Sequence, residues 1–209
     1  MKRISLTVIA ALFAYLLLWP VAIAPVSWEA SQNQGYVGDF VQNNRLSALK
    51  IIELTDTHGP EGLALLNGEI YTATREGWIL KYSEASGEIS KMANTNGSPL
   101  GLVFDANGNL LIADAYKGIL SMSADGELTV LTNSIDGVAI EYADDLDVTE
   151  DGKIYFSDAS SKFGAQANGG TYAASLLDIA EHGSHGRLLV YDPTDQSTKL
   201  VMDDLNFAN

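Results

Sequence analysis

The chain has 209 residues, with 27 acidic and 12 basic side chains, a formal net charge of −15 and no cysteine. The absence of cysteine excludes disulfide scaffolds, thiolate zinc sites and cysteine nucleophiles. The negative charge argues against nucleic acid as a partner, because phosphate contacts need clustered lysine and arginine. A hydrophobic content of 46% is typical of a folded chain.

Residues 1–28 predict a signal-anchor or transmembrane segment. Lys2 and Arg3 precede an uncharged stretch that is long enough to cross a bilayer as a helix. The position of these basic residues predicts that the rest of the chain is exported to a periplasmic, lumenal or extracellular location. Contact with the membrane is then expected through the N-terminal helix alone. The alternative is a secreted protein, cleaved at Ala22-Ile23-Ala24, although Pro25 is a poor neighbour for cleavage.

The rest of the chain contains a repeat. Residues 29–50 are polar and predict a linker, after which three similar units follow. Their turn glycines, Gly68, Gly108 and Gly152, are 40 and 44 residues apart, and each follows Asn or Asp between two short apolar runs. Such a dipeptide indicates a β-hairpin, and a repeat of this length with four short strands is typical of a β-propeller blade. The predicted blades cover about residues 51–94, 95–133 and 134–203.

The third unit carries an insertion at about residues 161–184. Ala173, Leu176, Leu177 and Ala180 recur at the spacing of one helix face, which predicts a short amphipathic helix. Two interpretations stay open for this insertion: a packed surface excursion, or a lid over one end of the propeller channel.

Four motifs carry a resemblance to a known family: Asp114–Gly118, Ala143–Leu146, Ile154–Phe163 and Gly186–Leu189. The chain resembles the strictosidine synthase-like family, in the branch of the adipocyte plasma membrane-associated proteins. The resemblance implies an all-β, six-bladed propeller related to gluconolactonases and paraoxonases, preceded by a membrane anchor. Residues 51–209 would then be its N-terminal half, with about three blades and the start of a fourth. We expect such a fragment to be poorly soluble, because its open end exposes strand edges and an apolar blade face.

Residues at one repeat position meet at the axis of a propeller, since the first strand of each blade lines the channel. Glu61, Leu100 and Asp144 occupy this position, and Asn209 matches it at the start of a fourth blade. Carboxylate and amide oxygens are the ligands that Ca²⁺ prefers. The resemblance implies calcium in the channel, with Glu61 and Asn209 matching the ligands of the metal-binding relatives. Asp144 stands where those relatives usually have asparagine, which adds a charge.

The residues beside this predicted metal site are candidates for substrate contact. Leu100, Asp145 and Tyr116 are expected to face a small ester or lactone. Asp114, Asp158 and Tyr116 end second strands, where a hydrogen-bonding role that stabilises the blades is the main expectation.

The sequence identifies no catalytic residue. It lacks the Gly-x-Ser-x-Gly nucleophile motif. His58 is expected in a loop, and His182 and His185 are expected to face solvent.

Three functions remain open from the sequence. The first is a membrane-anchored, calcium-dependent hydrolase of small esters or lactones, similar to an arylesterase or lactonase. The second is a non-catalytic propeller that binds a ligand or another protein. The third is a carbon–nitrogen condensing enzyme of the strictosidine synthase type. The sequence predicts no oligomeric state.

Overall fold

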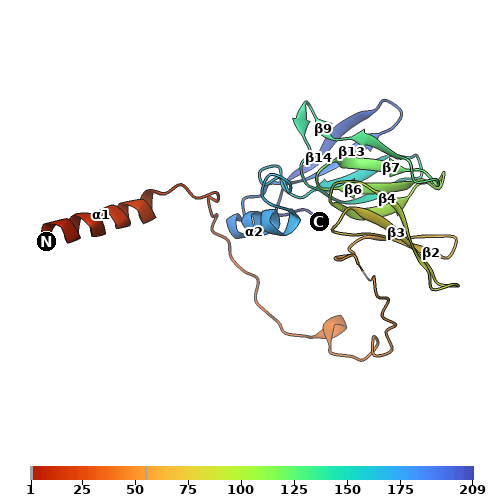
Figure 1. Ribbon diagram of the computed structural model, residues 1–209, viewed down its shortest axis with the longest axis horizontal. Coiled ribbons are helices and arrows are strands. Elements are labelled where there is room, and N and C mark those ends of the chain that lie inside the picture. The colour runs from red at the N-terminus through yellow and green to blue at the C-terminus, as the bar shows by residue number, and fades with distance from the viewer. Residues whose placement is uncertain (1, 55) are drawn as a thin grey trace.

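The computed structural model describes residues 2–54 and 56–209, in which three four-stranded antiparallel sheets form the folded body. Within each sheet the strands pair in sequence order, as expected for propeller blades (Figure 1). The first sheet contains β1 (Leu63–Leu66), β2 (Glu69–Ala73), β3 (Trp78–Ser83) and β4 (Ile89–Asn94). The second contains β5 (Pro99–Phe104), β6 (Leu110–Asp114), β7 (Gly118–Met122) and β8 (Leu128–Thr132). The third contains β11 (Ala143–Val148), β12 (Ile154–Asp158), β13 (Gly186–Asp192) and β14 (Ser197–Leu205).

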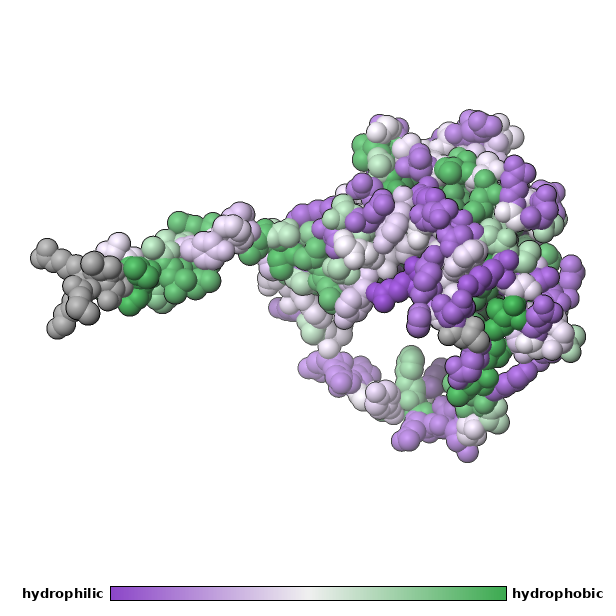
Figure 2. Space-filling model, in the orientation of Figure 1, coloured by the Kyte–Doolittle hydropathy of each residue, from purple (hydrophilic) through white to green (hydrophobic). Residues whose placement is uncertain are grey.

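Helix α1 (Lys2–Leu18) projects away from the sheets (Figure 1). Its side chains from Leu6 to Leu18 are exposed, and Figure 2 shows hydrophobic residues gathered on this arm. Within the described ranges, no helix is both long enough and apolar enough to span a membrane. The predicted transmembrane helix is therefore not found there. The helix ends at Leu18 because Pro20 disfavours helical geometry at the preceding residue.

The segment between α1 and the first sheet is largely exposed and irregular. Residues 29–50 contain one short 3₁₀ turn, η1 (Gly38–Phe40), and every residue in this range is exposed. Met1 and Thr55 lie outside the described residues, as do the side chains of Lys2 and Arg3, on which the predicted membrane orientation depends.

The middle sheet is covered on both faces. Leu110 and Ile112 of β6 pack toward the first sheet, whereas Leu111 and Ala113 pack toward the third. All five residues of β6 are buried, which explains its continuous apolar sequence. The first sheet has its outward face uncovered, because Leu63 and Leu65 are 67% and 71% exposed while the intervening Ala64 is buried.

A two-stranded hairpin joins the second and third sheets and was not predicted from the sequence. It consists of β9 (Ser134–Ile135) and β10 (Val138–Ala139), with Asp136-Gly137 as its turn. Both turn residues have positive φ, of 51° and 78°, which is the conformation that tight hairpins require. Strands of two residues carry too little alternation to be recognised in sequence.

The first strands of the three sheets lie side by side, with β5 between β1 and β11. The Gly62 N–H donates a hydrogen bond to Leu100 O at 3.1 Å, which joins the first two sheets at their inner edge. A Cβ on Gly62 would lie 2.4 Å from that same oxygen. A Cβ on Gly101 would lie 2.8 Å from Asp145 Cα and 2.9 Å from Asp144 O. The two glycines therefore permit a backbone approach that no other residue allows.

Replacing Gly101 with alanine is expected to lower the free energy of unfolding by roughly 2–3 kcal/mol, because the added methyl group meets backbone atoms that cannot rotate away. Urea denaturation measures this change. Gly68→Ala is the matched control: its Cβ meets no atom within 4 Å, and its cost comes only from a φ of +81°, about 1 kcal/mol. Equal losses in the two variants would contradict a steric role for Gly101.

Candidate functional site

The structure brings together the residues that the repeat predicted at the axis. Glu61, Asp144, Asp145 and Asn209 line one cavity of about 150 Å³, with Gly62 and Gly101 in its wall. Glu61 precedes β1 and Asn209 follows β14, so two segments distant in the sequence meet the start of β11. The predicted metal ligands, Glu61, Asp144 and Asn209, therefore share one site.

Irregular strand pairing positions the side chains of this site. The register between β5 and β6 shifts between Pro99 and Leu102, and the register between β11 and β12 shifts between Ala143 and Leu146. Each register shift includes the residue at the axial position and the residue after it. These are Leu100 and Gly101 in β5, and Asp144 and Asp145 in β11. Bulges of this kind redirect side chains and are common next to functional sites. Sequence periodicity does not reveal them, since a bulge depends on the partner strand.

Among the described residues, the carboxyl groups of the site have no cationic partner. Asp144 is only 4% exposed, and its side chain makes no hydrogen bond with any residue that the structure describes. Burial, followed by repulsion from Glu61 and Asp145, raises the pKa of Asp144 to about 7. Burial and the nearby Asp145 also raise the pKa of Glu61. Concentrated negative charge with unused oxygen lone pairs is a suitable environment for a cation.

The site is not a finished metal centre of clustered acidic groups. Over the described part of the chain, no group of three or more His, Cys, Asp or Glu side chains is placed to hold a metal ion together. Any ion at Glu61 and Asp144 would therefore also depend on the Asn209 amide, backbone oxygens or water as ligands.

A second cavity of about 230 Å³ extends the site toward the insertion. Glu61, Leu100 and Asp144 form part of its wall. The aromatic rings of Tyr142 and Phe207 add apolar surface, and they meet edge to face with centroids 5.4 Å apart. Leu100, predicted to contact substrate, therefore lies at the site, as does Asp145 in the first cavity. Tyr116 lies elsewhere: it packs in the apolar cluster under the insertion and lines neither cavity.

The insertion forms helix α2 (Thr171–Glu181), whose first turns cover this second cavity. Thr171, Tyr172 and Ser175 line it from the side opposite the sheets. The hydroxyl group of Tyr142 donates a 2.8 Å hydrogen bond to Thr171 O and ties the start of α2 to the axis. This placement favours the lid interpretation of the insertion over a simple surface excursion.

The buried face of α2 differs from the prediction. The sequence placed Ala173, Leu176, Leu177 and Ala180 on the packed face, but the fully buried residues are Ala174, Asp178 and Glu181. The two acids are tolerated there because they have partners from the insertion and the start of β13. Ser160 Oγ donates a short hydrogen bond to Asp178. Lys162 Nζ and His185 Nε2 each lie 2.7 Å from Glu181 Oε1.

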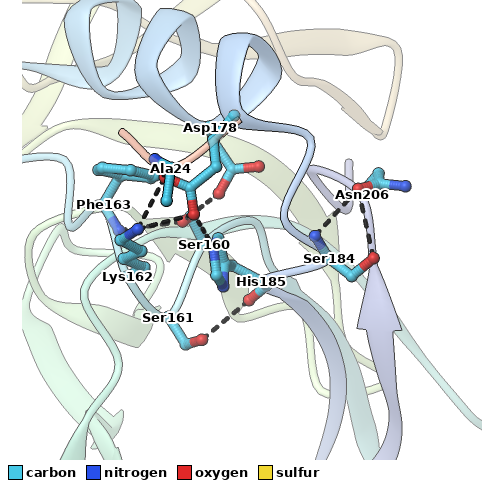
Figure 3. A network of polar contacts seen from close by, with 10 residues as sticks. Ala24, Ser160, Ser161, Lys162, Phe163, Asp178, Ser184, His185 and Asn206 are labelled. Carbon is cyan, nitrogen blue, oxygen red and sulfur yellow. Dashed lines mark hydrogen bonds and ion pairs between the residues drawn. The ribbon is translucent and has the colours of Figure 1, made fainter. Parts of the chain in front are cut away.

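Glu181 also connects α2 to the N-terminal segment. Figure 3 shows Ala24 of this segment in the same group of polar contacts as Lys162 and His185. The Ala24 N–H donates to Glu181 Oε2 at 2.8 Å, and the Val26 N–H donates to Glu181 O at 2.7 Å. Trp28 stacks on His182 with ring centroids 4.9 Å apart. Hydrogen bonds from Lys162, His185 and Ala24 lower the pKa of Glu181 to about 2, so its carboxylate stays charged. We call residues 23–28, which make these contacts, the N-terminal strap.

The structure corrects the predictions for two histidines and confirms those for two aspartates. His182 and His185 are half-buried in the strap and lid contacts and do not simply face solvent, which corrects the prediction for both. The structural roles of Asp114 and Asp158 are confirmed. Asp114 Oδ1 accepts hydrogen bonds from the Ser98 and Tyr116 N–H groups, and buried Asp158 pairs with Arg187.

Replacing Asp144 with asparagine is expected to stabilise the metal-free chain at high pH. Between pH 3.8 and about 7, the folded state retains a proton that the unfolded state has lost. The contribution of Asp144 to the free energy of unfolding therefore falls as pH rises through that window. In the presence of chelator, urea denaturation measures the free energy of unfolding of Asp144→Asn relative to wild type. This difference should rise by about 2 kcal/mol in favour of the variant between pH 4 and pH 8. Exposed Glu150→Gln is the control, and a gain that is the same at both pH values would contradict the assignment.

Replacing Trp28 with alanine is expected to loosen the last turn of α2. The substitution removes the ring that stacks on His182 and weakens the strap beside it. Hydrogen exchange followed by mass spectrometry should become faster in residues 176–185, with little change in the sheets. Trp19→Ala is the control, because the Trp19 ring contacts Tyr15 of α1 instead. Unchanged exchange in α2 would show that the strap does not hold the lid.

Comparison with known sequences identifies relatives along most of the chain. The family "Strictosidine synthase-like, N-terminal" matches residues 38–82, and the family "Strictosidine synthase" matches residues 144–209. Protein STRICTOSIDINE SYNTHASE-LIKE 6 of Arabidopsis thaliana is 36% identical, over 81% of this chain and 46% of its own length. The human adipocyte plasma membrane-associated protein is 31% identical, over 100% of this chain and 52% of its own. The chain thus spans about half the length of these curated relatives.

Solved structures share the fold at low sequence identity. A gluconolactonase from Xanthomonas campestris aligns with a TM-score of 0.56 at 20% identity, over 69% of this chain and 47% of its own. Regucalcin from Agrobacterium tumefaciens, described as a calcium-binding protein, aligns with a TM-score of 0.53 at 15% identity. The alignment covers 75% of this chain and 47% of regucalcin. The sheet arrangement, the axial motifs and the two sequence matches agree, and this chain belongs to the strictosidine synthase-like family.

Proposed function

We propose that this chain is part of a calcium-dependent hydrolase that acts on small esters or lactones. The observation that carries the proposal is the axial cavity, which is lined by the oxygen-bearing side chains of Glu61, Asp144 and Asn209 from three separate segments of the chain. The fold likeness to a gluconolactonase and to the calcium-binding regucalcin supports the same interpretation. Because the chain covers about half of its curated relatives, the activity of the whole protein is included in the proposal.

The donor set fits a hard divalent cation. Asp144 is buried without a hydrogen-bond partner in the described structure, and Glu61 contributes a second carboxylate to the same cavity. An ion at this point would offset both the burial and the repulsion that raise the pKa values of Asp144 and Glu61. Carboxylate and amide oxygens favour calcium over the transition metals, which prefer nitrogen and sulfur.

In the proposed mechanism, Glu61, Asp144 and Asn209 would hold the ion. A bound Ca²⁺ would polarise the carbonyl group of an ester or lactone and lower the pKa of a bound water. Leu100, Tyr142 and Phe207 offer an apolar wall for the acyl or aryl part of the substrate. Tyr172 and Ser175 on α2 cover the substrate and restrict access of bulk water.

The cellular location is also a proposal. The similarity to adipocyte plasma membrane-associated proteins supports a membrane-associated or exported protein, with the exposed apolar surface of α1 as the contact.

Calcium addition after chelator treatment is expected to raise the melting temperature of the 209-residue chain. Glu61→Gln and Asp144→Asn should each weaken calcium binding by at least about tenfold in isothermal titration, because each replaces a charged ligand with an amide. Hydrolysis of phenyl acetate and of a small lactone should depend on calcium and fall in the same variants. Glu150→Gln, an exposed acid in a turn, should change neither binding nor rate.

Two results would contradict the proposal. Chelator that leaves both the melting temperature and the turnover unchanged would exclude a role for calcium. Calcium binding at Glu61 without turnover of any ester or lactone would instead favour a binding propeller over a hydrolase.

A further inference from the structure

A third cavity, of about 200 Å³, adjoins the axial site on the side of the first sheet. It shares Glu61 and Leu100 with the cavity under α2, and Thr171 at the start of α2 borders both. A small molecule could therefore occupy the axial site and reach into this space at once. Its remaining wall includes His58 and Arg75, so its chemistry differs from that of the carboxylate-lined axis. We call it the Arg75 cavity.

Arg75 is held at the wall of this cavity by its backbone, and its charge has no protein partner. The Arg75 N–H donates a 2.9 Å hydrogen bond to His58 O, and a Cβ on Gly59 would lie 3.6 Å from Arg75 Cβ. Its guanidinium group makes no hydrogen bond or ion pair with residues 2–54 or 56–209. Arg187 behaves differently, because its guanidinium pairs with buried Asp158. Arg75 and Arg45 are both exposed, and neither guanidinium has a partner among the described residues, but only Arg75 lines a cavity beside the axial site.

The acid that follows Arg75 in the sequence does not neutralise it. Glu76 Oε1 lies 2.8 Å from His58 Nδ1, and Glu76 Oε2 accepts a 3.0 Å hydrogen bond from the His58 N–H. Both carboxylate oxygens are therefore engaged by His58. Glu61 also lines the Arg75 cavity, but it forms no ion pair with Arg75 within the described structure. The positive charge of Arg75 stays available to a ligand.

We propose that the Arg75 cavity is a specificity subsite that binds the carboxylate group of the substrate. Guanidinium and carboxylate groups match in planar geometry and can form two parallel hydrogen bonds. Leu100 and Pro99 provide an apolar surface for the short carbon chain that links this carboxylate to the reacting carbonyl. The inference rests on the proposed function and narrows it: the preferred substrates are esters or lactones that carry an anionic carboxylate arm.

The kinetic test compares two aryl esters that differ only in charge: monophenyl glutarate, with a free carboxylate, and its methyl ester, which is neutral. Arg75→Gln should lower kcat/KM for the anionic ester by about tenfold, mainly through KM, because a charge-assisted hydrogen bond is lost. The neutral ester should change less than about twofold. Arg45→Gln, which removes an exposed arginine from the linker, is the control and should affect neither substrate. Equal losses for both esters, or no loss for either, would overturn the inference.

If the wild-type chain hydrolyses neither ester, that result counts against the proposed hydrolase activity but does not test the subsite. A binding experiment tests the subsite in that case. Glutarate, which cannot be hydrolysed, is titrated into ¹⁵N-labelled chain while the arginine Nε–Hε signals are followed by NMR. One signal should shift to saturation, disappear in Arg75→Gln and persist in Arg45→Gln. An Arg75 signal that does not respond to glutarate would overturn the subsite, whatever the outcome of the kinetics.

Discussion

The close approach of the first strands at the axis is the constraint on which the rest of the structure depends. Gly62 and Gly101 let β1, β5 and β11 meet with separations that a Cβ would block. This contact gives the middle sheet two covered faces and divides the side chains of β6 between two cores. It also forces Glu61, Asp144 and Asp145 into one small cavity, so the packing that stabilises the blades creates the charge density of the site.

The electrostatic cost of that cavity explains why the cavity is suited to a positively charged ligand. Three carboxyl groups and one amide line one cavity, and the burial of Asp144, together with repulsion from Glu61 and Asp145, raises the pKa of Asp144 to about 7. A folded protein does not gain stability from such an arrangement unless a ligand compensates for it. The acids outside the site show the contrast: Asp158 and Glu181 are equally buried, yet each pairs with a cation of the chain itself. Unpaired Arg75 lies beside the same cleft and gives it the opposite charge at one end.

Helix α2 connects this cleft to the N-terminal region. Its first turn borders the cavities, and its last residue, Glu181, accepts hydrogen bonds from the strap, from Lys162 and from His185. Helix α2 is therefore held at both ends, by Tyr142 near the axis and by the strap at the far side. The N-terminal strap and the wall of the second cavity therefore contact the same helix.

Local patterns of glycine, turn and apolar residues were sufficient to predict the repeat, the hairpins within its three units, the family and the residues at the axial position. The sequence also placed helix α2, but not the buried face of that helix. Acidic side chains are rarely fully buried without a partner, and the burial of Asp178 and Glu181 depends on tertiary partners such as Ser160 and Lys162. Three other features likewise depend on the tertiary structure: the bulges at Asp144 and Leu100, the strap on α2, and the unpaired charge of Arg75. Each of these features depends on which distant segment of the chain packs against the residue. A sequence pattern along one strand or helix contains no information about that neighbouring segment.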